Sequence, residues 1–375
     1  MFRVKPDSKL TAVISGFDFT GSFIECEEIK TGHINRTYGL RFSLPDGGES
    51  RYVLQRINDF AFKKPAEVMH NVRLVTEHLR RATLAQGLDP ARRVLRLIPA
   101  RDGDYMLVDA EGGSWRAYDY ISGAVTVDRV DGPEQFREIG AAFGDFQTML
   151  ADFPIGELYD TIPHFHDTRQ RLRNFEASLA ADVKGRAASL AAEIAFVRER
   201  RDAMCRIVDM IESGEIPLRV THNDTKINNV MLDGETGEAL CVVDLDTVMA
   251  GSALYDYGDA IRYGACTADE DERDLARVAL DLELYAGFSE GFISRTARGL
   301  THAELVNLPL GALVMTYENG VRFLTDYLDG DVYFRIERPE HNLDRARCQF
   351  RLLRDMEAKR ERMDAIALEL IGRYR

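Results

Sequence analysis

The sequence lacks the features that mark several classes of protein. None of its 375 residues belongs to an apolar run of roughly 18, the length that spans a bilayer, so no transmembrane helix is predicted. The stretch Met1 to Asp7 has no apolar segment of the signal-peptide kind. The five cysteines are scattered and form no C-x-x-C pair, so neither a disulfide framework nor a thiolate zinc site is expected. We therefore expect a cytoplasmic protein with ordinary buried thiols.

Positive charge is scarce as well. The formal net charge is −14, and the basic clusters are short. Nucleic acids and anionic membranes repel such a chain unless a local basic patch outweighs the total. We expect a small-molecule substrate as the partner, with no nucleic-acid and no membrane partner.

Three common catalytic motifs are missing. There is no G-x-x-x-x-G-K-[ST], which excludes a P-loop kinase. There is no G-x-G-x-x-G either, so neither a Rossmann site nor the usual glycine loop of a protein kinase is indicated. A nucleophile elbow, G-x-S-x-G, is also absent. Any catalysis must therefore use another pattern.

The first third of the chain is rich in strand signals. Runs of β-forming residues at 32–42 and 51–57 flank a Pro-Asp-Gly-Gly turn, which predicts an antiparallel hairpin. A helix is predicted at 65–81, from apolar residues at helical spacing after a proline. A second hairpin is predicted within 105–121. Together these elements predict a small lobe, residues 1–118, that contains a sheet and one helix.

The rest of the chain, residues 119–375, is predicted to form a larger helical lobe, which gives an α+β, two-lobed protein. The predicted helices cover residues from 133, 167–213, 269–294, 301–328 and 343 to the end, with a β-rich interruption at 218–248. The final helix is amphipathic. It could form a dimer face, but docking onto its own lobe is the commoner use of such a face, so we expect a monomer or a homodimer.

The β-rich interruption contains the pattern H-x-D-x-x-x-x-N, followed by a strand, a turn, a second strand and an aspartate. Phosphoryl transfer to an alcohol needs a carboxylate beside the attacking hydroxyl, and Asp224 fits this role. It also needs oxygen ligands for the Mg²⁺ that bridges the ATP phosphates, and Asn229 and Asp244 fit that role. A hairpin would bring these two ligands together. The pattern predicts a kinase that uses ATP and Mg²⁺.

A metal-dependent hydrolase is an alternative hypothesis, because the sequence also contains an H-x-H-D cluster. Its candidate ligands are His164, His166, His222, Asp224, Asp244 and Asp246. This hypothesis leaves Asn229 and the strand-rich first third unexplained. The simpler interpretation of the cluster is the start of a helix with Asp167 as its cap. A non-catalytic nucleotide-binding module is a further alternative, which the complete acidic set disfavours.

These motifs resemble the aminoglycoside-phosphotransferase and choline-kinase superfamily. The segment from His222 to Asn229 is similar to its H-G-D-x-x-x-x-N loop, and Asp244 to its metal-binding aspartate. Residues 251–259 resemble its G-x-P-x-x-D-L segment. Asn223 stands where that superfamily usually has glycine, and Ala253 where it usually has proline. The resemblance implies a bilobal, protein-kinase-like fold with ATP and Mg²⁺ between the lobes.

Within that superfamily the chain resembles the N-acetylhexosamine 1-kinase group from about Gly32 to its end. The matching stretches are 32–38, 52–55, 143–147, 164–168, 221–226, 243–247 and 322–334. The resemblance implies phosphorylation of the anomeric 1-hydroxyl of GlcNAc or GalNAc. It implies Asp224 as the base, with His33, Asp224, Arg322 and Tyr333 as sugar contacts. Alternatively, Arg322 only pairs with Asp326, and Tyr333 is a core residue.

The small lobe departs from the superfamily, whose lysine grips the α- and β-phosphates of ATP. Gln55 and Arg56 occupy that region here. Arg56 could replace the lysine, or it could face solvent, because neighbours on a strand point in opposite directions. The adenine pocket is expected around Trp115 and Tyr118, which could instead be hairpin packing. The cation that binds the phosphates needs a glutamate as its partner, and the sequence leaves open whether this is Glu67 or Glu77 of the first helix.

A kinase of another small hydroxylated metabolite is the main alternative function. The candidate acceptors are another sugar, choline, homoserine and an aminoglycoside. Few acidic and aromatic signals of a cation cage are present, so a quaternary amine is disfavoured.

Overall fold

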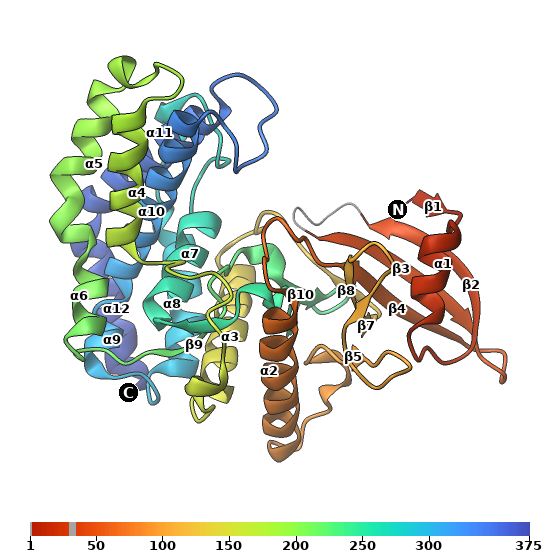
Figure 1. The fold of residues 1–375 in the computed structure, drawn as a ribbon. Coiled ribbons are helices and arrows are strands. Elements are labelled where there is room, and N and C mark those ends of the chain that lie inside the picture. The colour runs from red at the N-terminus through yellow and green to blue at the C-terminus, as the bar shows by residue number, and fades with distance from the viewer. Residues whose placement is uncertain (1, 30–34) are drawn as a thin grey trace.

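The protein consists of a sheet-rich N-terminal lobe and a larger helical C-terminal lobe (Figure 1). A computed structural model describes residues 2–29 and 35–375. The predicted α+β, bilobal architecture is confirmed. No helix in these two ranges combines the length and the apolarity needed to cross a bilayer. The five cysteines are free thiols, of which four are buried and Cys266 is partly buried.

The N-terminal lobe is built on a seven-stranded antiparallel sheet in the order β1-β2-β3-β4-β7-β5, with β6 paired to β7. Both hairpins predicted from the sequence are confirmed, as β3–β4 and β6–β7. The strands are β1 (Phe2–Val4), β2 (Ser22–Ile29), β3 (Arg36–Ser43), β4 (Glu49–Arg56), β5 (Leu97–Ile98), β6 (Leu107–Val108) and β7 (Ser114–Asp119).

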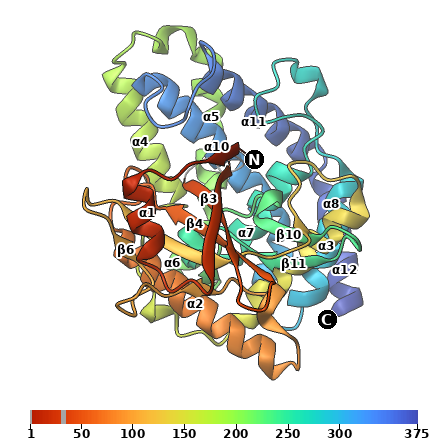
Figure 2. The ribbon, with the colours of Figure 1, turned by 90° about the vertical axis from the view of Figure 1, so that its right-hand side faces the viewer.

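The sheet has two differently packed faces, because side chains alternate along each strand. One face carries Leu54, Trp115 and Ala117 and packs with α1 (Ser8–Ser15) into the core of the N-terminal lobe. In the view onto this lobe, α1 lies in front and the helical lobe lies behind (Figure 2). The opposite face carries Tyr118, which packs with α2 (Pro65–Ala85).

A second hydrophobic core joins the two lobes. It combines Ile57 and Tyr118 of the N-terminal lobe with Phe146, Val220 and Leu245 of the C-terminal lobe. The side-chain amide of Asn71 on α2 also donates to the backbone oxygen of Val248, at 2.9 Å. The lobes are therefore held together by apolar and polar contacts.

The C-terminal lobe is helical, and some of its helices are shorter than predicted. The predicted helix 269–294 begins only at Leu282, because the segment before it forms a bridge between Cys266 and Leu280 and then a cap at Asp281. The region 167–213 contains three helices. The helices are α3 (Pro133–Met149), α4 (Thr168–Ala181), α5 (Ala191–Met204), α6 (Arg206–Glu212), α7 (Ala253–Gly264), α8 (Leu282–Thr296), α9 (His302–Val306), α10 (Leu308–Asp329), α11 (His341–Ala358) and α12 (Arg360–Tyr374).

Two long predicted helices are each broken once. The stretch 301–328 divides at Asn307, whose side chain donates to Ala303 O (2.8 Å), and α10 then begins at Leu308 with a proline in its first turn. The final stretch divides at Lys359, whose ammonium donates to Leu280 O (2.8 Å). Leu353, Met356 and Met363 of this stretch are fully buried, so it docks onto its own lobe as expected.

Candidate active site

The catalytic segment folds as short strands around a hairpin between the lobes. The elements are β9 (Arg219–Thr221), a 3-10 turn (Ile227–Asn229), β10 (Val230–Asp233), β11 (Ala239–Val242) and β12 (Met249–Gly251). In the β10–β11 register Val230 faces Val242, and the amide of Val243 donates to Asn229 O at 2.9 Å. Asn229 and Asp244 therefore lie at the same end of the hairpin, as the sequence predicts.

A buried carboxylate holds the backbone that leads to Asp224. Asp256, on the first turn of α7, accepts the amides of His222 (2.9 Å) and Asn223 (2.7 Å) and the side-chain amide of Gln147 (2.7 Å). The His222 ring donates from Nε2 to Val243 O (2.9 Å), so its Nδ1 accepts from the Asp224 amide (3.3 Å). His222 is thus a brace for the loop, and α7 determines where Asp224 lies.

The departure from glycine at position 223 has a structural reason. Asn223 has φ 64°, the left-handed region that favours glycine and tolerates asparagine. Its side chain also donates to Thr247 O (2.9 Å) and accepts from the Thr221 hydroxyl (3.0 Å). Asparagine therefore adopts the required turn and ties the loop to two neighbouring segments.

Asp224 lies beside a cation and is held ionised. Lys226 Nζ is 3.1 Å from Asp224 Oδ1. Burial alone would raise the pKa of Asp224, but the positive charge of Lys226 outweighs it and holds the pKa below its ordinary value. The side-chain amide of Asn229 donates to Asp224 O at 2.8 Å, which leaves its amide oxygen for another partner. An ionised carboxylate is the form that can accept a proton from a hydroxyl.

The Asp244 carboxylate suits a divalent cation. The residue adopts a left-handed conformation (φ 60°, ψ 56°) and is exposed to solvent. No donor or cation among residues 2–29 and 35–375 is bonded to its oxygens. Desolvation and the negative charges of Asp246 and Asp224 raise the pKa of Asp244 to about 6. The carboxylate oxygen and the amide oxygen of Asn229 are ligands that Mg²⁺ accepts, so these residues fit the predicted metal.

The alternative hydrolase site is not assembled. His166 is buried between Glu318 (3.0 Å) and the backbone oxygen of Asn223 (3.0 Å), so it supports the catalytic loop. His164 bonds to Asp167, which caps α4 by accepting the Gln170 amide. In the described part of the chain, no group of three or more His, Cys, Asp or Glu side chains is arranged to hold a metal ion.

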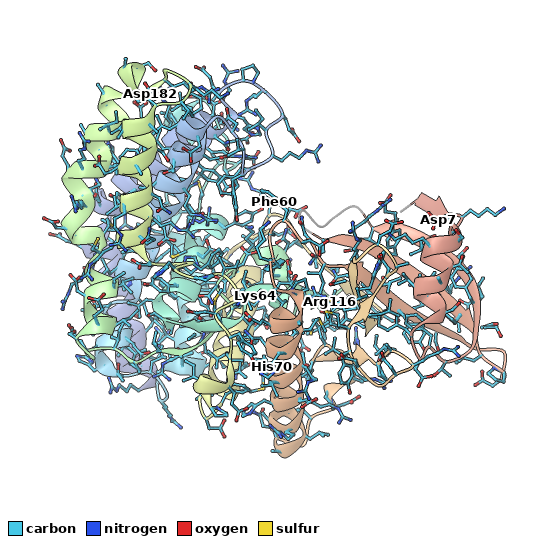
Figure 3. All side chains as sticks on the ribbon, viewed as in Figure 1. Asp7, Phe60, Lys64, His70, Arg116 and Asp182 are labelled. Carbon is cyan, nitrogen blue, oxygen red and sulfur yellow. The ribbon has the colours of Figure 1, made fainter. Side chains whose placement is uncertain are left out.

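The arginine that the N-terminal lobe places against the C-terminal lobe is Arg116, and not Arg56, which was considered from the sequence. Arg116, on β7, is 1% exposed and forms an ion pair with Asp246. It lies beside α2 at the boundary of the lobes (Figure 3). Its Nε and Nη2 donate to Gln55 Oε1, at 3.0 and 2.9 Å. Asn35 Nδ2 donates to the other Asp246 oxygen at 2.7 Å. Gln55 is therefore at the site, as a partner of Arg116.

Two predicted nucleotide contacts are not brought to the cleft. Arg56 points to the opposite face of the sheet and pairs with Asp59 at 3.4 Å. Trp115 lies on that same face, buried in the core of the N-terminal lobe, and donates to Asp109 Oδ2 (2.7 Å). Tyr118 faces the cleft side, with the Arg116 guanidinium 5.2 Å from its ring centre.

The two glutamates of α2 have local partners instead of the cleft cation. Glu67 pairs with Lys64 at 2.9 Å, and Glu77 with Arg73 at 3.4 Å. Both are pairs within one helical turn. The acidic partner of the cleft cation is Asp246 instead.

The predicted sugar contacts lie near the other side of the catalytic loop. The Arg322 guanidinium lies over the rings of Phe165 (5.4 Å) and Phe334 (5.5 Å). It does not pair with Asp326, whose oxygens accept three amides of the loop after α10, from Val332 to Phe334. Tyr333 is 54% exposed, so it is not a core residue. His33 lies outside the described residues.

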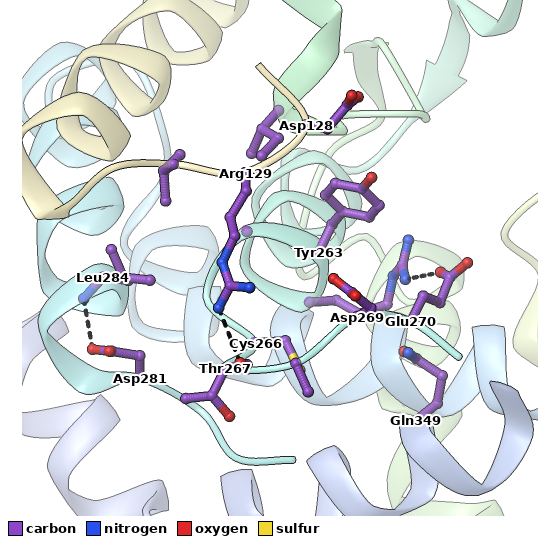
Figure 4. Close-up of a pocket in the computed structure, with 15 residues that line it drawn as sticks. Asp128, Arg129, Tyr263, Cys266, Thr267, Asp269, Glu270, Asp281, Leu284 and Gln349 are labelled. Carbon is purple, nitrogen blue, oxygen red and sulfur yellow. Dashed lines mark hydrogen bonds and ion pairs between the residues drawn. The ribbon is translucent and has the colours of Figure 1, made fainter. Parts of the chain in front are cut away.

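A cavity of about 370 Å³ adjoins the catalytic segment in the C-terminal lobe (Figure 4). Ile227 of the 3-10 turn forms part of its wall, together with the Arg262–Glu270 ion pair (2.6 Å). Arg129 crosses it to donate to Thr267 O at 3.1 Å. Neither Arg322 nor Tyr333 lines this cavity, so these two predicted sugar contacts lie outside it.

Arg116, Lys226, Asp256 and Glu318 are among the residues of this site that were not singled out for a role from the sequence. Arg116 lies between Trp115 and Ala117 on a largely buried strand, and a charge in such a place is the signal that could have identified it. Asp256 belongs to the segment that resembles G-x-P-x-x-D-L, but its contacts depend on α7. Glu318 lies within a long helix and gives no local signal.

The two-lobed fold and the catalytic hairpin between the lobes define a kinase-like phosphotransferase. The chain belongs to the phosphotransferase enzyme family (APH), whose profile matches residues 25–290, more than half of its length.

Solved structures share the fold at low sequence identity. The amicoumacin kinase hAmiN, in complex with AMP-PNP, Ca²⁺ and Ami, has TM-score 0.58 and 12% identity, over 94% of each chain. An aminoglycoside phosphotransferase from Alicyclobacillus acidocaldarius has TM-score 0.57 and 14% identity, over 99% of this chain and 98% of that one. The choline kinase from Cryptosporidium parvum has TM-score 0.56 and 15% identity, over 96% and 99%. At these identities the likeness concerns the fold.

Proposed function

We propose that this protein is an ATP- and Mg²⁺-dependent kinase that phosphorylates the anomeric hydroxyl of an N-acetylhexosamine. The observation that carries the kinase part is the hairpin that places Asn229 and Asp244 at one end, beside Asp224. These three residues supply a base and two metal ligands at a boundary between lobes. The N-acetylhexosamine part is supported by the sequence resemblance and by the setting of Arg322.

In this proposal, Asn229 and Asp244 hold the metal ion. When bound, Mg²⁺ supplies neutralisation of the phosphate charge and a fixed orientation for the nucleotide. The use of a nucleotide with a divalent cation is supported by one structural neighbour, which contains AMP-PNP and Ca²⁺. Tyr118 and Gln55 line the N-terminal side of the proposed nucleotide site.

Asp224 then acts as the base. Its carboxylate accepts the proton of the anomeric hydroxyl, which is more acidic than an ordinary alcohol. Lys226 keeps this carboxylate ionised, at 3.1 Å from it. The backbone clamp of Asp256 fixes its position, which matters because phosphoryl transfer depends mainly on positioning and electrostatics.

Arg322 is suited to bind an oxygen of the sugar. Its guanidinium has no carboxylate within 4.0 Å in the described ranges, and its one polar contact is Asn319 Oδ1, at 3.4 Å. Two aromatic rings hold it in place, so its N–H groups are free to donate to the acetamido or hydroxyl oxygens of a ligand. We propose Tyr333 and His33 as the further sugar contacts.

The remaining expectations fit this proposal. We propose that residues 1–118 cover the nucleotide and that residues 119–375 bind the sugar. The enzyme would work in the cytoplasm, where ATP is available, as a monomer or homodimer. We propose neither a nucleic-acid nor a membrane partner.

A coupled ADP-release assay with MgATP tests the function. The panel is GlcNAc, GalNAc, glucose, galactose, choline, homoserine and kanamycin. We expect turnover with the N-acetyl sugars, and a loss of about 100-fold or more in Asp224→Asn, because a positioned base contributes about that much. Turnover with another acceptor only would retain the kinase and reject the sugar. Equal turnover in Asp224→Asn would reject Asp224 as the base.

A further inference from the structure

Arg116 occupies the place at which a lysine is missing. β4 lacks the phosphate-binding lysine that the resemblance to the superfamily implies, and Gln55 and Arg56 occupy that region. In the β4–β7 register Gln55 lies directly opposite Arg116. Both side chains point to the face of the sheet that meets the C-terminal lobe. A cation is therefore supplied to this place by the neighbouring strand.

The guanidinium is held rigidly but is not saturated. Gln55 Oε1 accepts from Nε and Nη2, and Asp246 accepts from Nη1. An arginine has five N–H donors. The three bonds leave two N–H groups, one on each terminal nitrogen, without an acceptor among the described residues. A buried, oriented arginine with spare donors is suited to bind a phosphate.

The ion pair of Arg116 connects it to the segment that carries the proposed metal ligand Asp244. Asp246, the ion-pair partner, comes two residues after Asp244. Asp244 would hold the metal, which would supply binding of the nucleotide phosphates at this end of the hairpin.

We propose that Arg116 binds the phosphates of the nucleotide in place of the missing lysine, with Gln55 and Asp246 as the residues that position it. This inference rests on the proposed function. It assigns to Arg116 the role for which the sequence suggests Arg56. The acidic partner of this cation also differs from the expected one. It is Asp246 of the C-terminal lobe, and not a glutamate of α2.

The alternative is that Arg116 only fastens the two lobes together. The two roles differ in what a substitution does to binding. A fastening residue affects all ligands of the cleft alike, whereas a phosphate-binding residue affects only ligands that carry phosphate. The ratio of the dissociation constants of adenosine and MgADP separates them.

The experiment is equilibrium binding of adenosine and of MgADP to the full-length protein, without turnover. The variants are Arg116→Gln, Arg116→Lys and Arg56→Gln, each with a melting temperature as a folding check. In Arg116→Gln we expect MgADP to bind about 10- to 100-fold more weakly, the value of a charge-assisted hydrogen bond, with adenosine unchanged within about twofold. We expect Arg56→Gln to bind both ligands as the unmodified protein does.

Arg116→Lys decides the matter if Arg116→Gln does not fold, because it keeps a positive charge beside Asp246. Lysine is a point donor without the planar fork, so we expect MgADP binding to weaken several-fold relative to adenosine. An unchanged ratio in a folded Arg116 variant overturns the inference. If the unmodified protein binds adenosine and MgADP equally or not at all, the proposed function itself fails, and the inference fails with it.

Discussion

Single residues of the catalytic segment are held by partners that lie far away in the sequence. Asn223 takes a left-handed conformation that an ordinary side chain avoids, and its side chain bonds to Thr247 O at 2.9 Å. His166 and Glu318 support the same loop from the other side, through the backbone oxygen of Asn223. The position of Asp224 is thus determined by residues that are distant from it in the sequence.

Glu318 is predicted to stabilise the protein in a pH-dependent way. Burial opposes its charge, but His166, Arg171 and Arg322 outweigh this and lower the pKa of Glu318 below its ordinary 4.5. A carboxyl whose pKa falls on folding contributes stability that is complete above its ordinary pKa and is lost as the pH falls below it. We expect Glu318→Gln to lower the free energy of unfolding by about 2 kcal/mol at pH 7.

Urea unfolding at pH 7 and at several values below pH 4.5 measures this effect. The deficit of Glu318→Gln should shrink as the pH decreases, because the native carboxylate becomes protonated. The exposed Glu361 offers a matched control, since Glu361→Gln should change little at any pH. A deficit that is constant or grows toward low pH would show that the charge of Glu318 is not the cause.

Single residues also show how much of the site could be predicted from the sequence. The proximity of Asn229 and Asp244 was predictable because their spacing reflects a local hairpin. Arg116 was missed because its role depends on the pairing of β4 with β7, strands that are distant in sequence. Trp115 was assigned to the cleft because the sequence did not show which face of β7 looks outward.

At the scale of elements, α7 connects the packed helices of the C-terminal lobe to the catalytic loop, because its Asp256 accepts backbone amides of that loop. It begins at Ala253, where proline would also be accepted at the first helical position, and it carries Asp256 in its first turn. Glycines allow α7 and α10 to approach closely. A Cβ on Gly258 would collide with the backbone oxygen of Gly311, and one on Gly311 with that of Leu254.

We expect Gly258→Ala to reduce both stability and activity. Relieving the collision requires α7 to move away from α10, at a cost of about 1–3 kcal/mol for overpacking. The same movement shifts Asp256, so the maximal rate should fall even in the fraction that is folded. Urea unfolding and the ADP-release assay measure the two effects.

The control is Gly156→Ala, because nothing lies within 4 Å of a Cβ at that exposed position. It should change neither property appreciably. A Gly258→Ala protein as active and as stable as the unmodified one would mean that α7 does not depend on this contact.

Secondary structure was predictable where the signal is local. The β3–β4 hairpin follows from β-forming residues around a glycine turn, and α2 from its apolar spacing and its initial proline. The break at Lys359 was not predictable, because the bond that fixes that side chain ends on Leu280 O, far away in the chain. Tertiary contacts override helical spacing at such positions.

At the scale of the whole molecule, each lobe contributes part of one site. The N-terminal lobe supplies Arg116 and Gln55, and the C-terminal lobe supplies Asp224, Asn229 and Asp244. The shared hydrophobic core around Tyr118 and Leu245 keeps the lobes in register.

The most direct test of the central claim is the identity of the product. The protein is incubated with MgATP and GlcNAc or GalNAc, and ³¹P and ¹H NMR determine which carbon carries the phosphate. The account predicts a phosphate on the anomeric carbon, formed by the unmodified protein and not by Asp224→Asn. Phosphate on another hydroxyl of the sugar, or no phosphorylated sugar while another panel member is phosphorylated, would contradict it.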